Sequence, residues 1–299
     1  EGGGISKESI DVHRSTHMSD SASIPLFARP DMLEIGKSAE VQTPGSGWGY
    51  QSAIHSTAKD VESLWPGLPS GLLEAIRATT GSPYTRSAYV LHNQAFTREV
   101  EYFCNLCQEI GGNVQMYFRK MPKDGETRFI RRPHLPEFIE YPGFQEIFNR
   151  FLKNDVILEP CPSLLFDQKI SVLFPFHPKL REYYSDAIRD LFPETYLVER
   201  GALFEFDDQT FNLQDICTLS KSRREFILKY GGAKSGMWAG GKAVYNLSDC
   251  SHDTVASMID NALRDWEDRR MPWVIQKRVK RKYPITFLDH IAGELKEAQ

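Results

Sequence analysis

The residues best suited to chemistry lie in one short stretch of the chain, at 226–244. An apolar run, FILKY, contains Lys229 and leads directly into a loop rich in glycine, GGAKSGMWAGG. A lysine beside glycines can bind phosphate, because the ammonium supplies charge and unhindered backbone N–H groups supply hydrogen bonds. The stretch therefore indicates either a phosphate-binding loop or a simple turn, and the pattern around it decides between them.

Two common phosphate-binding designs fit this loop poorly. The dinucleotide fingerprint G-x-G-x-x-G does not occur in it. The P-loop pattern G-x-x-x-x-G-K-[ST] is nearly met from Gly236 to Lys242, but Ala243 stands where a magnesium-binding hydroxyl is needed. The following residues, KAVYNL, predict a strand, whereas a P-loop kinase or NTPase requires a helix at 242–247.

A third design is a glycine loop that joins two antiparallel strands and folds over a nucleotide as a flap. Its backbone N–H groups hold the terminal phosphates, and a lysine on the preceding strand points at them. FILKY, the glycine loop and KAVYNL occur in this order. The sequence therefore favours a flap above Lys229.

This order resembles the ATP-grasp family, in which a later strand also forms a hinge that binds adenine. The run VIQKRV, which ends at Val279, resembles that hinge strand, with Lys277 where the family usually has glutamate. An upstream lysine is typical as well, and Lys169 in PSLLFDQKISVLF takes its place, although a solvated lysine on a helix is the alternative. The next segment of the family, F-P-x-T, is matched by Phe192-Pro193-Glu194-Thr195. The resemblance implies ATP contacts from Lys169, Lys229, Gly231, Gly232, Ser235, Gly236, Gln276 and Val279.

Metal ligands are missing from their usual place after the hinge, where the sequence offers no E-x-N pair. Near the other end, RPD from Arg29 and EVQTP from Glu40 resemble the R-x-D and E-x-N … T-P elements of glutathionylspermidine synthase and its relatives. These are circularly permuted ATP-grasp ligases, whose metal-binding strands precede the lysines. The resemblance implies that Arg29 is catalytic and contacts the transferred phosphoryl group, while Asp31, Glu40 and Gln42 bind Mg²⁺.

The details of this metal-binding segment depart from the family. Gln42 replaces asparagine, and the spacing from Asp31 to Glu40 is shorter than usual. Strand alternation still places Glu40 and Gln42 on one face, as joint ligation requires. The alternative is a hairpin that merely exposes two carboxylates.

The resemblance implies an ATP- and Mg²⁺-dependent ligase that joins a carboxylate to an amine through an acyl phosphate. Its substrates would be small molecules or peptides, and a homodimer is compatible with it. The competing hypothesis is an ATP-binding regulatory protein without catalysis, which Gln42 and Lys277 favour.

The elements that must position these residues are predicted from hydrophobic periodicity. A strand at 87–93, a helix at 96–112 and a strand at 113–120 form a β-α-β crossover, the unit of a parallel sheet. The fold class is therefore α+β or α/β, and the resemblance narrows it to two ATP-grasp lobes with a β-α-β substrate domain. The predicted regions are a flexible lead-in at 1–24, metal-binding strands at 25–56, the β-α-β region at 57–155 and the nucleotide-binding region at 156–299.

Composition excludes several other classes. The net charge of -4 argues against bulk attraction to nucleic acid or membranes, and the basic run QKRVKRK is better explained as a solvated face. No apolar run could span a membrane and the first residues lack a secretory pattern, so we expect a cytoplasmic protein. The cysteines number five, which suits reduced thiols, and Cys104 and Cys107 of a C-x-x-C pair fall on the apolar face of the helix.

One further basic segment, FIRRPHLPEF, places Arg131, Arg132 and His134 between prolines. It suits either a surface loop with ordinary charges or a loop that binds an acidic substrate. No nucleophile elbow and no H-E-x-x-H zinc motif occurs in the chain.

Overall fold

The computed structural model describes most of the chain between residues 6 and 298. The described residues are 6–19, 25–26, 29–34, 37–42, 48, 52, 67–123, 125–206, 209–232, 243–269, 271–279, 285–289 and 294–298. In the strands at 29–34, 285–289 and 294–298, and for all of 37–42 except Ser38, only the backbone is described.

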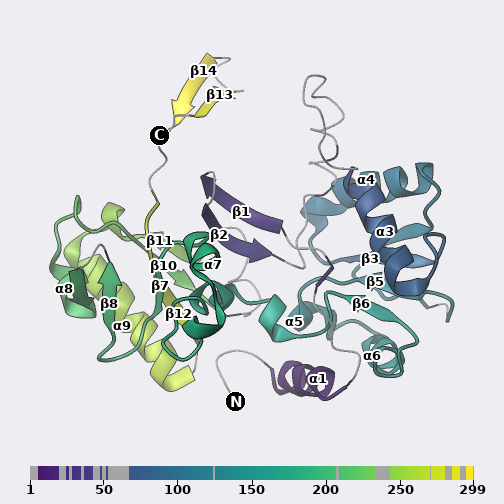
Figure 1. Ribbon diagram of the computed structural model, residues 1–299, viewed down its shortest axis with the longest axis horizontal. Helices are drawn as coiled ribbons and strands as arrows, with labels where there is room; N and C mark the ends of the chain where they lie inside the picture. The colour runs from purple at the N-terminus through teal and green to yellow at the C-terminus, as the bar shows by residue number, and fades with distance from the viewer. Residues whose placement is uncertain are drawn as a thin grey trace.

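A four-stranded parallel sheet with the order β4-β3-β5-β6 forms one half of the molecule (Figure 1). Its strands are β3 (Ser87–Leu91), β4 (Val114–Phe118), β5 (Phe129–Arg131) and β6 (Ile157–Glu159). It is covered by α3 (Leu68–Thr80), η1 (Gln94–Phe96), α4 (Thr97–Glu109), α5 (Leu135–Phe138) and α6 (Phe144–Leu152). The predicted crossover is confirmed, because α4 connects two parallel neighbours, β3 and β4.

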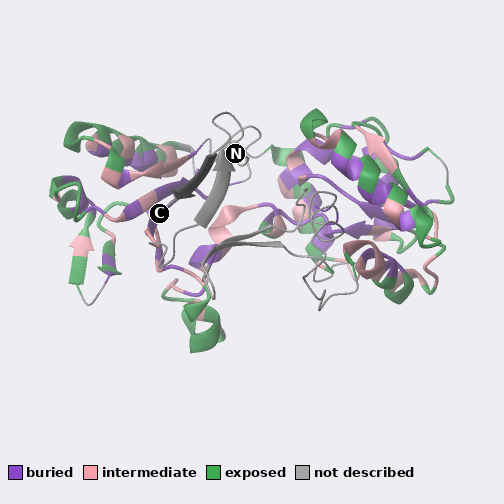
Figure 2. Cartoon of the chain, turned by 90° about the horizontal axis from the view of Figure 1, so that it is seen from above, coloured by how far each residue is buried: buried purple, intermediate pink, exposed green. Residues whose placement is uncertain are grey.

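Both faces of this sheet are buried, which explains why β3 is apolar from Ala88 to Leu91. Tyr89 and Leu91 belong to the core that α3 and α4 share, whereas Ala88 and Val90 belong to the core around α5 and α6. All residues of β3 are buried as a result. Figure 2 shows the same pattern, with buried strands inside and exposed helix surfaces outside.

A four-stranded antiparallel sheet with the order β11-β10-β12-β7 forms the other half. Its strands are β7 (Thr195–Leu197), β10 (Phe226–Tyr230), β11 (Val244–Asn246) and β12 (Trp273–Lys277). Around it lie β8 (Leu203–Phe206), β9 (Gln209–Asn212), α8 (Leu213–Thr218), η5 (Leu247–Asp249) and α9 (His252–Arg269). The strand at β11 contradicts the P-loop alternative, which requires a helix there.

Only one face of the antiparallel sheet packs into an apolar core. Leu228 and Tyr230 of β10 share this core with Val255 and Ile259 of α9. These α9 positions recur one helical turn apart, as an amphipathic helix over a sheet requires. Residues that alternate with Leu228 and Tyr230 therefore lie on the other face, which is the face of interest below.

Residues 7–17 differ from the flexible lead-in predicted for the N-terminus. They form α1 (Lys7–His17), which Ser6 caps by accepting a hydrogen bond from the N–H of Ser9. Val12 is buried in the core around α6, and the hydroxyl of Thr16 donates to the Pro162 carbonyl at 3.1 Å. One apolar turn among polar residues is enough for this helix to pack against the core. Hydrophobic periodicity over so few residues is a weak indication of a helix, which is why the sequence did not predict it.

The segment between the two sheets contains short helices, whereas the run FDQKISVLF at 166–174 predicts the start of a longer helix. These are η2 (Leu164–Phe166), η3 (Lys169–Leu173), η4 (Arg181–Tyr183) and α7 (Asp186–Asp190). Between the halves lies an antiparallel hairpin of β1 (Arg29–Glu34) and β2 (Lys37–Gln42), as Figure 1 shows. A second hairpin is formed by β13 (Ile285–Asp289) and β14 (Glu294–Ala298).

The molecule is thus a mixed α/β protein with one parallel sheet and several antiparallel sheets, in agreement with the broad fold class predicted. In the described part of the chain, no helix has the length and apolar character needed to cross a membrane.

Candidate functional site

Lys229 is buried on the polar face of the antiparallel sheet. It lies at the centre of β10, between Leu228 and Tyr230, and only 7% of its surface is exposed. Because its two neighbours point into the apolar core, Lys229 lies on the opposite face. Lys229 is therefore a buried cation at the centre of the sheet, and burying an ammonium is costly unless other groups compensate its charge.

Other polar side chains share this face. In the register of the sheet, Gln276 of β12 pairs with Ile227 of β10 and with Thr195 of β7. The amide of Gln276 donates to the Thr195 hydroxyl at 2.9 Å, and both side chains are buried. We call Thr195, Ile227, Lys229, Val274 and Gln276 the Lys229 face.

Thr195 had been recognised only as part of an F-P-x-T resemblance, with no role assigned. Its hydroxyl donates to the Pro193 carbonyl at 2.8 Å while it accepts from Gln276. The threonine therefore fixes the orientation of the Gln276 amide. A threonine that pairs across strands with a buried glutamine could not have been found without the strand register.

The segment that carries Lys169 lies against this face. The N–H of Ile170 donates to the Gly231 carbonyl at 2.9 Å, and the Gly231 N–H donates to the Pro272 carbonyl at 2.8 Å. The first residue of η3, Lys169, is half-buried and directly precedes Ile170. The structure thus brings the segments of both predicted lysines to one corner of the sheet.

Glycine is required by close approach at two positions here. A Cβ at Gly231 would lie 3.3 Å from Cβ of Ile170, and a Cβ at Gly232 would lie 2.4 Å from the Tyr230 hydroxyl oxygen. The start of the predicted loop is therefore packed tightly between β10 and η3. Ser235 and Gly236 lie outside the described residues.

The hairpin with the predicted catalytic and metal-binding positions is also close. Strand β2 lies against η3, and the N–H of Ser38 donates to the Leu191 carbonyl at 2.7 Å. In the hairpin register, Arg29 pairs with Gln42, and Asp31 pairs with Glu40. Directly paired residues and alternate residues of a hairpin share a face, so all four positions lie on one face. No group of three or more histidines, cysteines or acids that could hold a metal occurs among the described side chains, a set that excludes those of Asp31 and Glu40.

The predicted hinge strand corresponds to β12, which is an inner strand of the same sheet. At its end, the N–H of Lys277 donates to the Glu194 carbonyl at 2.9 Å, and the N–H of Arg278 donates to the Glu225 carbonyl at 2.8 Å. Val279 follows and is half-buried. Its position next to the Lys229 face is compatible with the predicted adenine contact, which no contact in the structure tests.

The basic segment around Arg132 is not a surface loop. Arg132 is fully buried, and its guanidinium donates to both oxygens of Asp167, at 3.1 and 3.0 Å. Its remaining hydrogen bonds go to the carbonyls of Pro133, Pro160 and Cys161. We call Arg132, Asp167 and the adjacent His134 the Arg132 corner.

The charges of the Arg132 corner are balanced internally. Burial alone would raise the pKa of Asp167, but Arg132 and His134 outweigh it and hold that pKa below its usual value. Arg131 is buried as well, with Nη1 3.5 Å from Glu159 Oε1. Both alternatives for FIRRPHLPEF were therefore wrong about these arginines, since neither is exposed to solvent or to a ligand. Burial of the pairing acids, which sequence spacing does not reveal, is the reason.

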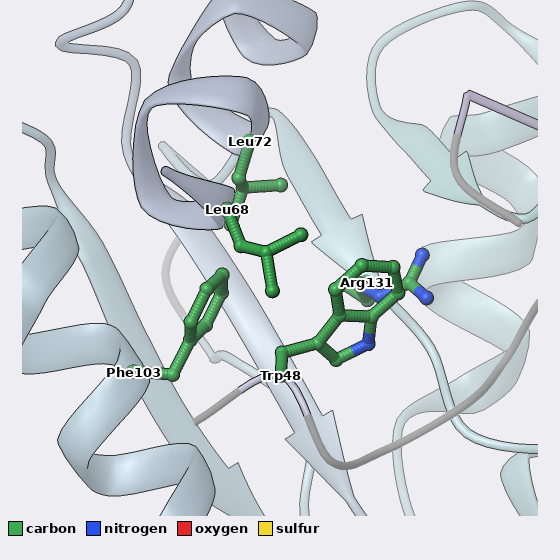
Figure 3. A pocket seen from close by; sticks show the side chains of 5 residues that line it. All are labelled: Trp48, Leu68, Leu72, Phe103 and Arg131. Carbon is green, nitrogen blue, oxygen red and sulfur yellow. The ribbon is translucent and has the colours of Figure 1, made fainter. Parts of the chain in front are cut away.

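The C-x-x-C pair and the pocket around Arg131 are parts of the core. Burial raises the pKa of Cys107 to about 12 and raises that of Cys104 as well, so both stay as inert thiols. Figure 3 shows a pocket beside Arg131, whose guanidinium carbon lies 5.2 Å from the centre of the Trp48 ring. Its volume of about 10 Å³ is near the limit for one water molecule, so it is too small for a substrate.

Comparison with known proteins adds no family assignment. No protein-family model matches the chain, and no curated protein is a significant match. The site must therefore be interpreted from its own residues.

Proposed function

We propose that the protein is an ATP- and Mg²⁺-dependent carboxylate–amine ligase with an ATP-grasp fold. The observation that carries this proposal is the hydrogen bond from Ile170 to Gly231, which joins the segments of Lys169 and Lys229 on the polar face of an antiparallel sheet. The hairpin of Arg29 to Gln42 lies beside the same segment. Residues from three distant parts of the sequence thus meet in one place, and their types suit a nucleoside triphosphate.

In this proposal the two lysines bind the phosphates of ATP. Lys229 is buried, and charge pairs gain strength where water is excluded. Lys169 is half-buried and approaches from η3, so the two ammonium groups would neutralise different phosphate oxygens. Gln276, held by Thr195, presents its side chain on the same face.

The donor set of the hairpin suits magnesium. Two carboxylates and an amide on one hairpin face, Asp31, Glu40 and Gln42, provide the oxygen ligands that this ion prefers. These residues would hold a magnesium ion, which would offset the negative charge of the phosphates. Arg29 occupies the same face and would stabilise the charge that develops on the transferred phosphoryl group.

The chemistry would proceed in two steps. The carboxylate substrate attacks the terminal phosphorus of ATP, which gives an acyl phosphate and ADP. The amine then attacks the acyl carbon, and phosphate leaves. The enzyme contributes by holding both reactants in place and by stabilising charge.

Binding is tested first, with thermal unfolding in the presence of Mg-ATP. A ligand at about 100 times its Kd stabilises the folded state by about 2.7 kcal/mol, so the wild-type protein should unfold at a clearly higher temperature. Lys229→Met should abolish this shift, while Lys153→Met, which removes an exposed lysine on the other half, should retain it. An equal shift in all three proteins would contradict the assigned nucleotide site.

Catalysis is tested second, by ADP release from mixtures of acids and amines. Release that requires both an acid and an amine supports the ligase. Magnesium-dependent ATP binding without ADP release from any mixture would instead favour the regulatory alternative. Gln42 and Lys277, which depart from the family pattern, are the residues that favour this alternative.

A further inference from the structure

A second polar site lies at the carboxyl edge of the parallel sheet. The connection after β3 leads to β4 on one side, and the connection after β5 leads to β6 on the other. At such a switch point the two connections leave a crevice, and open parallel sheets bind ligands there. His92 directly follows β3, and the helix that follows β5, α5, carries Glu137.

Glu137 is a buried acid with an incomplete set of contacts. Only 5% of its surface is exposed, and its Oε1 lies 3.6 Å from Nε2 of His92, which is longer than a hydrogen bond. Its other oxygen, Oε2, is buried and has no hydrogen-bond partner among the described residues. A buried acceptor in this state costs free energy, which makes Oε2 a place where a donor from a ligand would be favourable.

His92 and Tyr141 form the wall of this site. Nδ1 of His92 and the Tyr141 hydroxyl oxygen are 2.7 Å apart, and the two rings lie parallel. The side chain of His92 is 28% exposed, so it stands between Glu137 and solvent. Arg119 fixes the backbone here, because its Nε donates to the His92 carbonyl at 2.9 Å.

Burial and neighbouring acids keep Glu137 protonated in the resting state. Burial is the largest cause and Asp167 and Glu140 add to it, whereas Arg119 opposes them, and together they raise the pKa of Glu137 to about 8. Burial also lowers the pKa of His92, with Arg119 and His134 acting in the same direction and Glu140 against it. The nearest groups are therefore a neutral acid and a neutral imidazole, and Arg119 is a positive charge that an incoming ammonium meets beside them.

We propose that Glu137, with His92 and Tyr141, receives the amine substrate of the ligase and accepts its proton at Oε2. This rests on the function proposed above. When the ammonium R–NH₃⁺ binds, Glu137 first releases its own proton to solvent and becomes a carboxylate. The ammonium then gives one proton to this carboxylate, and the amine lone pair forms the C–N bond while the C–O bond to phosphate breaks. Phosphate leaves with that electron pair and takes the second proton from nitrogen.

The position of Glu137 in the fold agrees with this role. Asp167 is close enough to raise the pKa of Glu137, and it is anchored by Arg132 in the Arg132 corner. Lys169, the proposed phosphate ligand, follows Asp167 by two residues, a stretch of chain that spans at most about 7 Å. The amine site and the phosphates would therefore lie on two sides of the same short segment.

Binding can be tested without ATP and without knowing the natural amine. The probe is 1,4-diaminobutane, added while the side-chain carboxyl carbons of ¹³C-labelled glutamate are titrated by NMR. One resonance should titrate near pH 8 in the wild-type protein and be absent in Glu137→Gln. An ammonium that binds the carboxylate tenfold more tightly than the acid lowers this midpoint by about one unit.

Tetramethylammonium is the control, because it matches the charge of one ammonium group of the diamine but has no N–H to donate. It should leave the midpoint unchanged. A midpoint that does not move with the diamine, or moves equally with tetramethylammonium, would overturn the proposal whatever the outcome for ATP. The wild-type titration suffices for this conclusion if the variant does not fold.

The catalytic part is tested with hydroxylamine, which is neutral at pH 7 and traps acyl phosphates without a proton acceptor. With the acid that supports ADP release, Glu137→Gln should form hydroxamate at nearly the wild-type rate but lose about 100-fold or more with the amine. Equal rates with both nucleophiles, or equal losses, would overturn the role of Glu137. Absence of ADP and hydroxamate in the wild-type protein would instead overturn the ligase function.

Discussion

Two buried cations, Arg132 and Lys229, serve opposite purposes in the two halves of the molecule. Arg132 is enclosed by a carboxylate and three carbonyls that use its donors from several directions. Lys229 lies on a sheet face bordered by a glycine and by a segment with a second lysine. The arginine fixes the fold, whereas the lysine is the residue to which the proposed function assigns phosphate binding.

Both charges are buried, but the groups that Arg132 contacts are fixed backbone carbonyls and a carboxylate. A planar guanidinium can be satisfied completely by fixed backbone oxygens, as Arg132 is. An ammonium on a flexible stem in a glycine-lined corner can adjust to a ligand. Burial alone therefore does not identify a functional cation, and replacing each one in turn separates the two roles.

The largest effect is expected for Arg132→Met. It leaves the fully buried Asp167 without its bidentate arginine partner and with His134 alone beside it, and breaking such a buried pair costs about 3 to 5 kcal/mol. The free energy of unfolding, from urea titration, measures the loss. The double variant Arg132→Met/Asp167→Leu should recover part of it, because it removes both charges. If the free energy of unfolding of the single variant falls by less than about 1 kcal/mol, Arg132 does not stabilise the fold as a buried ion pair would.

Lys229→Met should show the reverse pattern. Methionine keeps the apolar stem, so we expect the free energy of unfolding to change by no more than about 1 kcal/mol. Stabilisation by Mg-ATP should disappear, and ADP release should fall by about 100-fold or more. Denaturant titration and ADP release on the same preparation separate the two effects. A variant that unfolds like Arg132→Met would mean that Lys229 is structural as well.

The sequence predicted the Lys229 face better than the Arg132 corner, for a physical reason. Strand alternation is local, so FILKY and VIQK indicate their own strands, and the order of strand, glycine loop and strand indicates their antiparallel pairing. The pair of Arg132 with Asp167 is 35 residues apart and forms only when β5 and β6 bring their ends together. No periodicity marks such a contact.

The short helices of the linker show the same limit. The run FDQKISVLF at 166–174 predicts the start of a helix from its apolar residues. In the structure it contains the end of η2 and all of η3, since Asp167 turns inward to Arg132 and the Ile170 N–H turns to Gly231. Tertiary hydrogen bonds thus overrode local preference at the very segment that carries Lys169.

An intermediate effect is expected from Glu137, which lies near the Arg132 corner but is not locked. Its pKa of about 8 in the folded state, above the usual 4.5, means that the folded state holds a proton that the unfolded state releases. Stability from this group is full below pH 4.5 and is lost as the pH rises through 8. Between pH 5 and pH 8 the loss should be about 3 kcal/mol.

Glu137→Gln should remove this part of the pH dependence, since glutamine does not titrate. Urea titrations of both proteins at pH 5 and pH 8 measure it. Glu140→Gln is a matched control, because Glu140 is exposed and belongs to the same segment. If wild type and Glu137→Gln lose the same stability with rising pH, Glu137 is not the buried acid that the structure describes.

The smallest change in stability is expected for a substitution of Gly231, which also tests whether the segment of Lys169 supports binding of Mg-ATP. An alanine Cβ would lie 3.3 Å from Ile170 and 3.4 Å from the Pro272 carbonyl, so η3 must move by a few tenths of an ångström. We expect Gly231→Ala to cost about 1 to 2 kcal/mol and to weaken Mg-ATP stabilisation, because Lys169 moves with η3.

Gly71→Ala is the matched control, because that glycine lies in α3 with no atom within 4 Å of the new Cβ. It should gain about 0.5 to 1 kcal/mol and bind Mg-ATP as the wild type does. If Gly231→Ala loses stability but binds Mg-ATP unchanged, the contact between η3 and β10 only supports the fold. Lys229 would then have a structural role, as Arg132 does, and the proposed difference between the two cations would be wrong.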